Sequence, residues 1–555
     1  MRAPLQKRSG QALLMVTVSL FAMCGVIGLA TDLGWAYFVR KSAQAAADSG
    51  ARAACQSVFN TVKQTTPVVC SGNAQCQPSI TACGSVTGNL QVGCEYASSN
   101  GFDASRSANQ NVTMAAGTTS PAPTAPGVNV DYWVTTRAVQ AIPQLFSSVL
   151  GNRQALVAAR ATAAIVHVVA AGNLYALNRE NDPGLNGTGI DIHLQGSGAG
   201  LRGVNAGGVF LASDVPGTGA TQGSATVRSM YTQVRLGGTA NWSYTNGTDG
   251  AQFKDPMRDL GQPPAPQGLP NVAVPGGSIT GDCSNPLNLT PGNYYATDSN
   301  GNATGGQINI TGCVNMTNSG AWGSYVFFGG VLINSPHTVV TVSPGMYIFA
   351  GTQNSSLYAQ DSNATITDQT ALVNGNTVPN TDAGEIFVFA GKNYPNLQVP
   401  PAVQPILSTL NYGSVDIQTG NHNVVNLHGL NADSANLPTD LAPFAPTVFW
   451  QDQGNSLIKY TADGNIDLSC GGINTPCLNP SSSVSPSMNL QAHPNLHLYG
   501  AVYQPRGAAL TFQGSGTVSS PVQLITGTLT TYGGPTLTLL PVTNPFRRRA
   551  VALIE

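Results

Sequence analysis

The chain carries very little charge. Only 9% of its 555 residues are Asp, Glu, Lys or Arg, and 23 basic and 25 acidic side chains leave a formal net charge of −2. A surface that binds nucleic acid needs clustered Lys and Arg. Outside the flanks of an N-terminal apolar segment, such a cluster occurs only at Arg547-Arg548-Arg549. The composition therefore excludes nucleic acid as a partner.

The sequence also lacks the constellations that common enzymes use. A nucleophile elbow, a P-loop and a dinucleotide fingerprint are all missing from strand–turn–helix settings. Asp191 and Asp416 stand alone in the strands expected to hold them, and the histidines, His428 among them, are scattered. His493 and His497 lie four residues apart without a third ligand nearby. We therefore expect no catalytic residue, no cofactor, no metal site and no enzymatic activity.

One long uncharged segment lies near the N-terminus. Residues 12–30 contain no charged side chain, and as a helix they rise about 28 Å, close to the thickness of one hydrocarbon core. Basic residues precede the segment at Lys7 and Arg8 and follow it at Arg40 and Lys41. Aromatic residues typical of a membrane–water interface lie just beyond it, at Trp35, Tyr37 and Phe38. The segment predicts a helix that crosses a lipid bilayer.

The helix is expected to continue beyond the membrane as a stalk, because residues 42–54 are mainly Ala, Ser and other small residues. The slight excess of basic residues before the segment favours a cytoplasmic N-terminus, which places the bulk of the chain in the periplasm or outside the cell. Cleavage of a signal peptide after Ala30 is the alternative. The apolar run is longer than most signal peptides have, and helical sequence follows it, so we expect an uncleaved single pass.

The same segment resembles a known family. The run Gly28-Leu29-Ala30-Thr31-Asp32-Leu33-Gly34, followed by Tyr37, Arg40, Gln44 and Ala46-Ala47-Asp48, is similar to the N-terminus of TadE/TadG-like Flp (tight-adherence) pilus-assembly proteins. Weaker similarities at residues 96–101 and 150–152 extend the resemblance through residue 170. The resemblance implies a bacterial inner-membrane protein that works in pilus assembly beside other pilus-assembly or envelope proteins.

Asp32 is an unusual residue for the membrane boundary. Its helical neighbours at positions 28, 29, 35 and 36 are all uncharged, and an ionised carboxylate there needs water or a partner. Asp32 either reaches headgroup water or meets a basic group on a partner helix. Gly28 and Gly34 would let such a helix approach closely. We therefore predict a membrane and partner-helix surface made of Gly28, Asp32, Gly34, Trp35 and Tyr37.

Ten cysteines indicate an oxidising compartment. Cys70, Cys76, Cys83 and Cys94 crowd one loop-rich stretch at spacings wider than those of zinc sites. Two disulfides are expected among them, and three connectivities remain open. Two further local disulfides are expected later in the chain, between Cys283 and Cys313 and between Cys470 and Cys477.

Composition divides the chain into four segments. Residues 1–58 form the anchor and stalk helix, 59–170 a small cysteine-containing α/β module, 171–545 a β-rich ectodomain, and 546–555 a tail. Within the module we expect a strand over 128–137, a short helix over 142–150 and a strand over 153–169.

The ectodomain shows short apolar runs separated by Gly, Asn and Pro. Such runs occupy 209–211, 324–330, 345–351, 385–391, 496–503, 508–512, 522–529 and 536–540. Their spacing leaves no room for crossover helices, so the fold is mainly β. Tight polar turns and stacked Val, Ile, Leu and Phe favour a right-handed parallel β-helix. A β-sandwich or a pair of jelly rolls is the alternative.

The resulting hypothesis is a non-enzymatic, membrane-anchored component of a pilus-assembly or adhesion apparatus, with surface glycans as candidate ligands. Two other functions stay open: an envelope-tethered carbohydrate-active enzyme built on a β-helix, and a general surface protein unrelated to pili.

Overall fold

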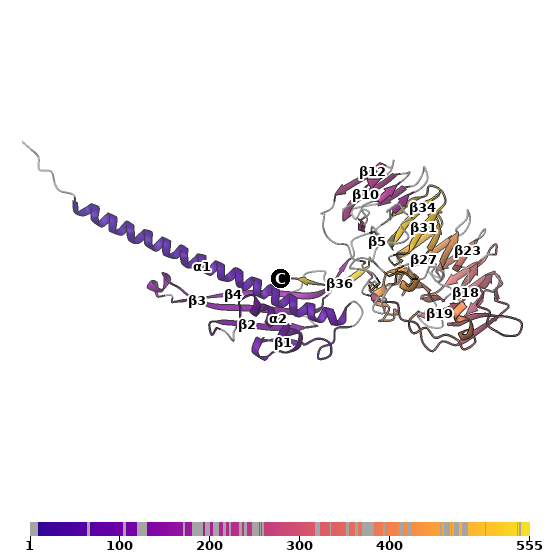
Figure 1. The fold of residues 1–555 in the computed structure, drawn as a ribbon, viewed down its shortest axis with the longest axis horizontal. Helices are drawn as coiled ribbons and strands as arrows, with labels where there is room; N and C mark the ends of the chain where they lie inside the picture. Colours follow the sequence, from indigo (N-terminus) through magenta and orange to yellow (C-terminus); the bar gives the residue numbers. More distant parts are fainter. Residues whose placement is uncertain are drawn as a thin grey trace, which may run out of the picture. The chain divides into compact units, whose positions relative to one another are not determined.

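The computed structural model describes residues 9–63, 67–103, 107–118, 130–151, 153–169, 260–316, 322–333, 335–350, 355–360, 364–368, 382–391, 394–409, 414–418, 424–455, 487–505, 507–540 and 546–554, with shorter pieces at 173–259 and 458–479. The chain divides into two compact units (Figure 1). The first unit is Met1–Val168 with Arg549–Glu555, and the second is Val169–Arg548. The last residues, expected to form a tail, thus belong to the first unit.

The first unit pairs two helices with one sheet. Strand order in the sheet is β1-β2-β3-β4-β36, and β1 to β4 are antiparallel. The helices are α1 (Ser9–Val62) and α2 (Gly88–Ser99). The strands are β1 (Gln77–Ala82), β2 (Gln110–Gly117), β3 (Val130–Pro143), β4 (Gln154–Val169) and β36 (Arg547–Leu553), and short 3₁₀ turns lie at η1 (Cys83–Ser85) and η2 (Ser147–Leu150).

The expected stalk packs on this sheet and on α2 of the same chain. Small residues of α1, including Ala43, Ala47 and Ala51, are fully buried in one core with the strands and α2. Their small size lets the helix backbone lie close to the sheet. At Gly93 of α2, an added Cβ would overlap the backbone oxygen of Gly50, so the two helices touch through glycine.

The strand predicted over 153–169 is confirmed as β4, but the helix predicted over 142–150 is wrong. β3 runs on to Pro143, because Ile142 is fully buried in the core and pairs with Ala155 of β4. The strands then end in a hairpin, and only Ser147–Leu150 form a 3₁₀ turn. Leu145 and Phe146 have a helix-like apolar pattern in sequence, yet they lie at the tip of this hairpin.

The second unit is a parallel β-helix, which confirms the favoured fold and excludes the β-sandwich. Each coil contributes one strand to each of three parallel sheets, here called sheets I, II and III. Sheet I contains β13 (Asn271–Pro275), β16 (Gly292–Thr297), β19 (Gly323–Phe328), β22 (Gly345–Ala350), β25 (Glu385–Ala390), β28 (Thr447–Gln451), the second half of β30 (Leu496–Tyr503) and β33 (Val522–Thr526).

Sheets II and III follow the same order along the chain. Sheet II contains β14 (Ser278–Thr280), β17 (Ile308–Thr311), β20 (Val331–Ile333), β23 (Ser355–Gln360), β26 (Ser414–Gln418), β29 (Ser487–Gln491), β31 (Ala509–Gln513) and β34 (Thr528–Tyr532). Sheet III contains β15 (Leu287–Leu289), β18 (Cys313–Met316), β21 (Val339–Val342), β24 (Thr365–Asp368), β27 (Val424–His428), the first half of β30, β32 (Thr517–Ser520) and β35 (Thr536–Leu539).

The earliest coils stack on the last ones. β5 (Leu174–Arg179), β6 (Ile192–Leu194) and β7 (Gly200–Gly203) pair in parallel with β33, β34 and β35. Further strands extend this end: β8 (Phe210–Asp214), β9 (Thr218–Ala220), β10 (Ser224–Tyr231), β11 (Leu236–Gly237) and β12 (Asn241–Asn246). The first and last coils of the unit are therefore neighbours in space.

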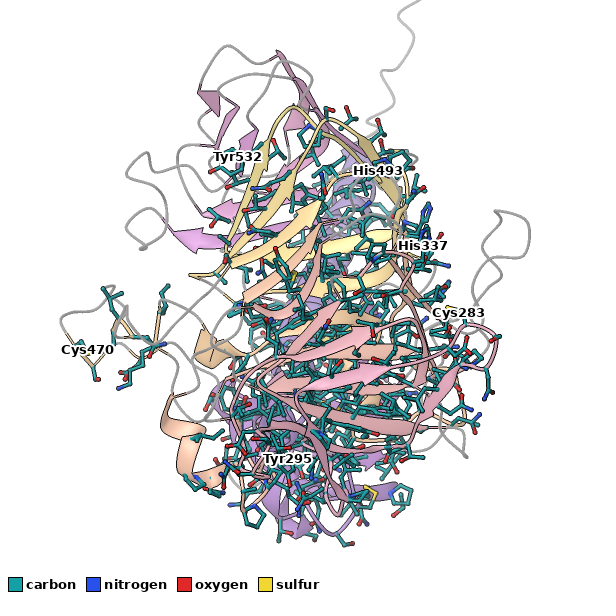
Figure 2. All side chains as sticks on the ribbon, turned by 90° about the vertical axis from the view of Figure 1, so that its right-hand side faces the viewer. Cys283, Tyr295, His337, Cys470, His493 and Tyr532 are labelled. Atoms are coloured by element: carbon teal, nitrogen blue, oxygen red, sulfur yellow. A yellow bond between two sulfur atoms is a disulfide. The ribbon has the colours of Figure 1, made fainter. Side chains whose placement is uncertain are left out.

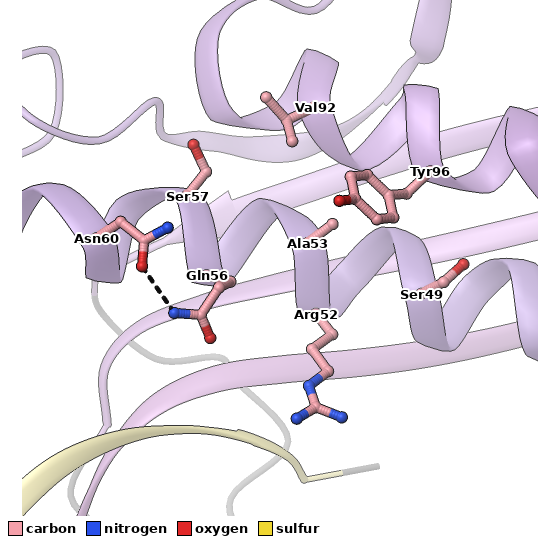
Figure 3. A pocket seen from close by; sticks show the side chains of 8 residues that line it. All are labelled: Ser49, Arg52, Ala53, Gln56, Ser57, Asn60, Val92 and Tyr96. Carbon is pink, nitrogen blue, oxygen red and sulfur yellow. Dashed lines mark hydrogen bonds between the residues drawn. The ribbon is translucent and has the colours of Figure 1, made fainter. Parts of the chain in front are cut away.

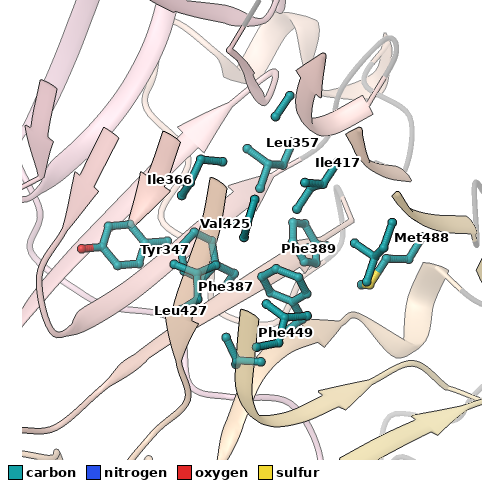
Figure 4. Close-up of a cluster of buried hydrophobic side chains, with 14 of the residues drawn as sticks. Tyr347, Leu357, Ile366, Phe387, Phe389, Ile417, Val425, Leu427, Phe449 and Met488 are labelled. Carbon is teal, nitrogen blue, oxygen red and sulfur yellow. The ribbon is translucent and has the colours of Figure 1, made fainter. Parts of the chain in front are cut away.

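Stacked side chains fill the solenoid (Figure 4). Aromatic rings of sheet I form ladders from coil to coil, with ring centroids 5.2 Å apart for Tyr325 and Tyr347 and 5.5 Å apart for Phe349 and Phe389. The opposite face of sheet I is buried too, under loops, and includes Trp450. Burial on both faces explains why these strands are continuous apolar runs.

Candidate functional site

The structure places the predicted membrane and partner-helix surface on α1. This is a helix long and apolar enough to cross a membrane. Leu13 to Leu33 expose most of their large apolar side chains. Trp35, Tyr37 and Phe38 are exposed as well, and Trp35 and Phe38 stack with ring centroids 5.9 Å apart. The aromatic group thus lies on the helix surface directly after the apolar segment.

The sequence predicted that Asp32 reaches headgroup water or a basic group on a partner helix. In the structure its hydrogen-bond partners belong to the same chain. The side chain is buried, and its carboxylate accepts backbone N–H groups of Leu145, Phe146 and Ser147 at 2.8–3.1 Å. The Ser147 hydroxyl donates a fourth hydrogen bond at 2.9 Å. The carboxylate therefore caps the η2 turn and ties the β3–β4 hairpin tip to α1.

Gly28 also contacts the hairpin tip. A Cβ at this position would overlap the Phe146 ring, so the absence of a side chain lets Phe146 pack on the helix. Gly28 is consequently closed to a partner helix by this ring. Gly34, by contrast, has open space where its Cβ would lie. Gly34, Trp35 and Tyr37 stay a predicted surface for lipid or a partner.

A groove of ≈ 430 Å³ lies farther along the same helix, between α1 and α2 (Figure 3). Its residues are Ser49, Arg52, Ala53, Gln56, Ser57, Asn60, Val92 and Tyr96. The Gln56 amide donates to Asn60 at 2.9 Å along one rim. Apart from Arg52 the groove is uncharged. Nothing in the sequence pattern had pointed to it, because its residues come from two helices that meet only in the fold.

All four expected disulfides are present in the structure. In the cysteine-rich stretch the disulfides are Cys70–Cys76 and Cys83–Cys94, one of the three connectivities that the sequence left open. The later disulfides are Cys283–Cys313 and Cys470–Cys477. Cys470 lies on a loop that projects from the solenoid, and Cys283 lies at its opposite edge (Figure 2). Cys24 and Cys55 are free.

A second site, missed from sequence, lies inside the β-helix. Asp368, Glu385 and His428 each offer a ligand atom, and these atoms lie within 4.8 Å of one another. Asp368 ends β24, Glu385 begins β25 and His428 ends β27, so all three stand at the corner between sheets III and I. Asp368 and Glu385 are nearly or fully buried, and His428 is 6% exposed.

Polar contacts in this cluster are incomplete. Glu385 accepts the backbone N–H of His428 through Oε1 at 2.7 Å, while Oε2 has no hydrogen-bond partner among the described residues. His428 Nδ1 lies 3.2 Å from an Asp368 carboxylate oxygen. The His428 ring stacks on the Tyr499 ring, with the ring centroids 4.5 Å apart. Burial raises the pKa of the Glu385 carboxyl well above its usual range, and the charge of Asp368 raises it further.

The register of the coils explains why sequence reasoning missed the cluster. Asp368 pairs with Val342, which pairs with Met316, so an acid stands in an apolar row of the core. Glu385 pairs with Gly345 of the preceding coil. Asp368 can be recognised as an acid in a core position only when the strands of successive coils have been aligned. In the unaligned sequence, His428 is an isolated histidine.

Comparison with known proteins gives one family. Residues 10–57 match the family model of TadE/G-like Flp pilus-assembly proteins, which confirms the resemblance seen in the N-terminal motif. No curated protein sequence matches the chain. Among solved structures, the competence-associated pilin ComZ from Thermus thermophilus is 9% identical, with 82% of this chain and 85% of that chain covered and a TM-score of 0.25. A TM-score this low says nothing about the function of the chain.

Proposed function

We propose that this protein is a membrane-anchored, extracytoplasmic component of a Tad/Flp-type pilus-assembly or adhesion apparatus, and that it has no enzymatic activity. One observation carries the proposal: the family match covers residues 10–57, which is the part of the chain that holds the candidate membrane-spanning segment. The anchor lies in the bacterial inner membrane, and other pilus-assembly or envelope proteins meet the chain along α1.

Two observations support a location outside the cytoplasm for the bulk of the chain. Four disulfides distributed over both units need an oxidising compartment. Basic residues at Arg2, Lys7 and Arg8 precede the apolar segment and favour a cytoplasmic N-terminus. The β-helix then serves as a scaffold or adhesive surface, with surface glycans among its candidate ligands.

The competing function is a carbohydrate-active enzyme. Glycoside hydrolysis needs two carboxyl groups that reach the sugar. Asp368 and Glu385 form a close acidic pair, contrary to the expectation from sequence, but both are buried in the core and out of reach of a polysaccharide. This favours the non-enzymatic proposal. A surface protein unrelated to pili remains the third reading.

An anchor exchange tests the proposal. Cells without this protein should lose assembled Flp-type pili and tight adherence, and the full chain should restore both. A chain whose residues 10–27 are replaced by an unrelated apolar sequence of equal length, with Gly28, Asp32 and the buried Ala positions of α1 kept, should reach the same abundance without restoring either. Normal piliation in cells that lack the protein would refute the pilus role, and release of sugars from a polysaccharide by the purified chain would favour the enzyme.

A further inference from the structure

We propose that Asp368, Glu385 and His428 bind one divalent transition-metal ion, with Zn²⁺ as the best fit, as a structural site inside the β-helix. Imidazole nitrogen and carboxylate oxygen are common zinc ligands. Three such atoms within 4.8 Å of one another can surround a single ion. The site joins successive coils, since the ligands come from β24, β25 and β27.

The burial of these side chains is the first argument for an ion. A buried ionisable group is costly unless it is paired, hydrogen-bonded or metal-bound. Glu385 Oε2 is buried without a hydrogen-bond partner among the described residues, and so is Nε2 of the His428 ring, while Nδ1 of that ring lies 3.2 Å from an Asp368 carboxylate oxygen. A cation between them supplies the missing interaction for the carboxylate and the imidazole together.

A comparison with Asp452 gives the second argument. This acid is also buried, but its two oxygens accept hydrogen bonds from the Gln262 amide and from the backbone N–H groups of Gly391 and Gly454, at 2.7–2.9 Å. The fold therefore can satisfy a buried carboxylate internally where no ion is required. At Glu385, one oxygen has no hydrogen-bond partner in the part of the chain that the structure describes.

The alternative to an ion is a proton held by Glu385. In that state Glu385→Gln is nearly isosteric and should change stability little. With a bound ion, Glu385→Gln removes a ligand and should release the metal. The two states therefore predict different results for the same variant.

The test measures the metal content and melting temperature of the full chain in detergent, as purified and after refolding with Zn²⁺ alone. We expect about one zinc per chain, with the content lost in Glu385→Gln and His428→Gln and retained in Asp452→Asn. A chelator should lower the melting temperature of the wild-type chain only to that of Glu385→Gln. Wild-type protein without metal under both conditions, or an equal metal content in Glu385→Gln, would overturn the proposal.

We infer from a separate observation that the tip of the β3–β4 hairpin inserts into the lipid surface beside α1. This inference rests on the proposed membrane anchor. The hydrogen bonds of Asp32 and the packing of Phe146 on Gly28 tie the tip to the level at which the uncharged segment ends. A tip attached there cannot avoid the bilayer that the segment enters.

The exposed side chains of the hairpin suit this position. Leu145 is 68% exposed, Leu156 is 70% exposed and Phe146 is 46% exposed. Leu33 and Leu29 of α1 expose their side chains at the same level. An apolar surface continuous with a membrane span is best covered by the lipid around that span. A helix and a hairpin held together at the bilayer limit how far the first unit can tilt.

Depth-dependent quenching tests the inference in the full chain, reconstituted in nanodiscs made with brominated lipids. A fluorescent amino acid at Leu145 should be quenched. The same probe at Ile80, an equally apolar residue of β1 that is 70% exposed, should not be quenched. Equal signals at Leu145 and Ile80 would overturn the inference. A probe at Phe21 separates this outcome from failure of the anchor, because without a membrane anchor Phe21 would also remain unquenched.

Discussion

At the scale of single residues, Asp32 shows how tertiary contacts change the meaning of a motif. In sequence it is a charge without a partner beside an apolar segment. In the fold it holds a hairpin through three backbone N–H groups and one hydroxyl. A hydrogen bond to an ionised group is stronger than one between neutral groups, so this single side chain fixes a local arrangement.

Replacing Asp32 by Asn should release the hairpin tip. The variant loses the charge and one acceptor, at a cost of about 1–3 kcal/mol in the local opening free energy. Amide hydrogen exchange at Leu145, Phe146 and Ser147 should therefore become faster. Asp48→Asn is the matched control, since Asp48 lies on the same helix and accepts a hydrogen bond from the side-chain amide of Gln44, four residues away. Unchanged exchange at the three amides would contradict the assigned role of Asp32.

Asp131 makes a residue-scale prediction about acid. It accepts from His167 at 2.9 Å and pairs with Arg549 of β36. Burial raises the pKa of Asp131, but His167 and Arg549 lower it more, so the pKa lies below its usual value of 3.8. Between the folded and the unfolded pKa, Asp131 is protonated more often in the unfolded chain than in the folded one. The stabilisation that Asp131 contributes is therefore fully present above pH 3.8 and is lost as the pH falls through the folded pKa. As the pH is lowered, amide hydrogen exchange in β36 of the wild type should accelerate at a higher pH than exchange in β2. In Asp131→Asn the exchange of β36 should no longer show this acid dependence.

At the scale of elements, small residues decide how the first unit packs. The Ala-rich run of α1 was expected from sequence to pack against other helices, because small residues allow close approach. The sheet buries that run. The contact between α1 and α2 is equally close, since Gly93 leaves room for the Gly50 carbonyl, Ala54 and the Met114 side chain.

Gly93→Val should push α2 away from α1. Overpacking of this kind costs about 1–3 kcal/mol, so the melting temperature of the first unit should fall, and the groove of Figure 3 should change shape. Gly84→Val is the control, because an added Cβ at Gly84 would meet no atom of the described residues within 4 Å. Equal melting temperatures for the two variants would show that the glycine contact is unimportant.

At the scale of the whole molecule, the chain contains two units with separate hydrophobic cores. The β-helix core is one cluster of buried side chains, in which aromatic rings of sheet I stack on the rings of neighbouring coils. Phe349 lies between Phe327 and Phe389, with centroid separations of 5.6 and 5.5 Å. In a solenoid each coil contacts mainly its neighbours, so damage in one coil weakens the adjacent ones.

Phe349→Ala should therefore destabilise the second unit and spare the first. Loss of a buried Phe costs about 3–5 kcal/mol, and hydrogen exchange of β22 and its neighbours should accelerate while α2 and β2 keep their protection. Tyr532→Ala, at a partly exposed position of β34, is the control with a small expected effect. Loss of protection in both units would show that they fold as one.

The sequence alone determined the features that depend on local composition and spacing. The uncharged run with its aromatic border marks the membrane segment, and the family motif is contained in the same residues. Short apolar runs closed by Gly, such as 345–351 and 385–391, favoured parallel coils but left a β-sandwich open, because the spacing excludes crossover helices and not antiparallel pairing. The pairs Cys283–Cys313 and Cys470–Cys477 were local enough to be expected directly.

Tertiary structure decided the features that depend on which distant residues meet. It chose among the cysteine connectivities, bound Asp32 to residues 145–147 and placed the Ala-rich part of α1 on a sheet. It also brought Asp368, Glu385 and His428 to one corner, where hydrogen bonding between coils aligns strands that are far apart in the chain. Register is set by the stacking of whole coils rather than by any short motif, and a cluster built through register is therefore visible only in the folded molecule.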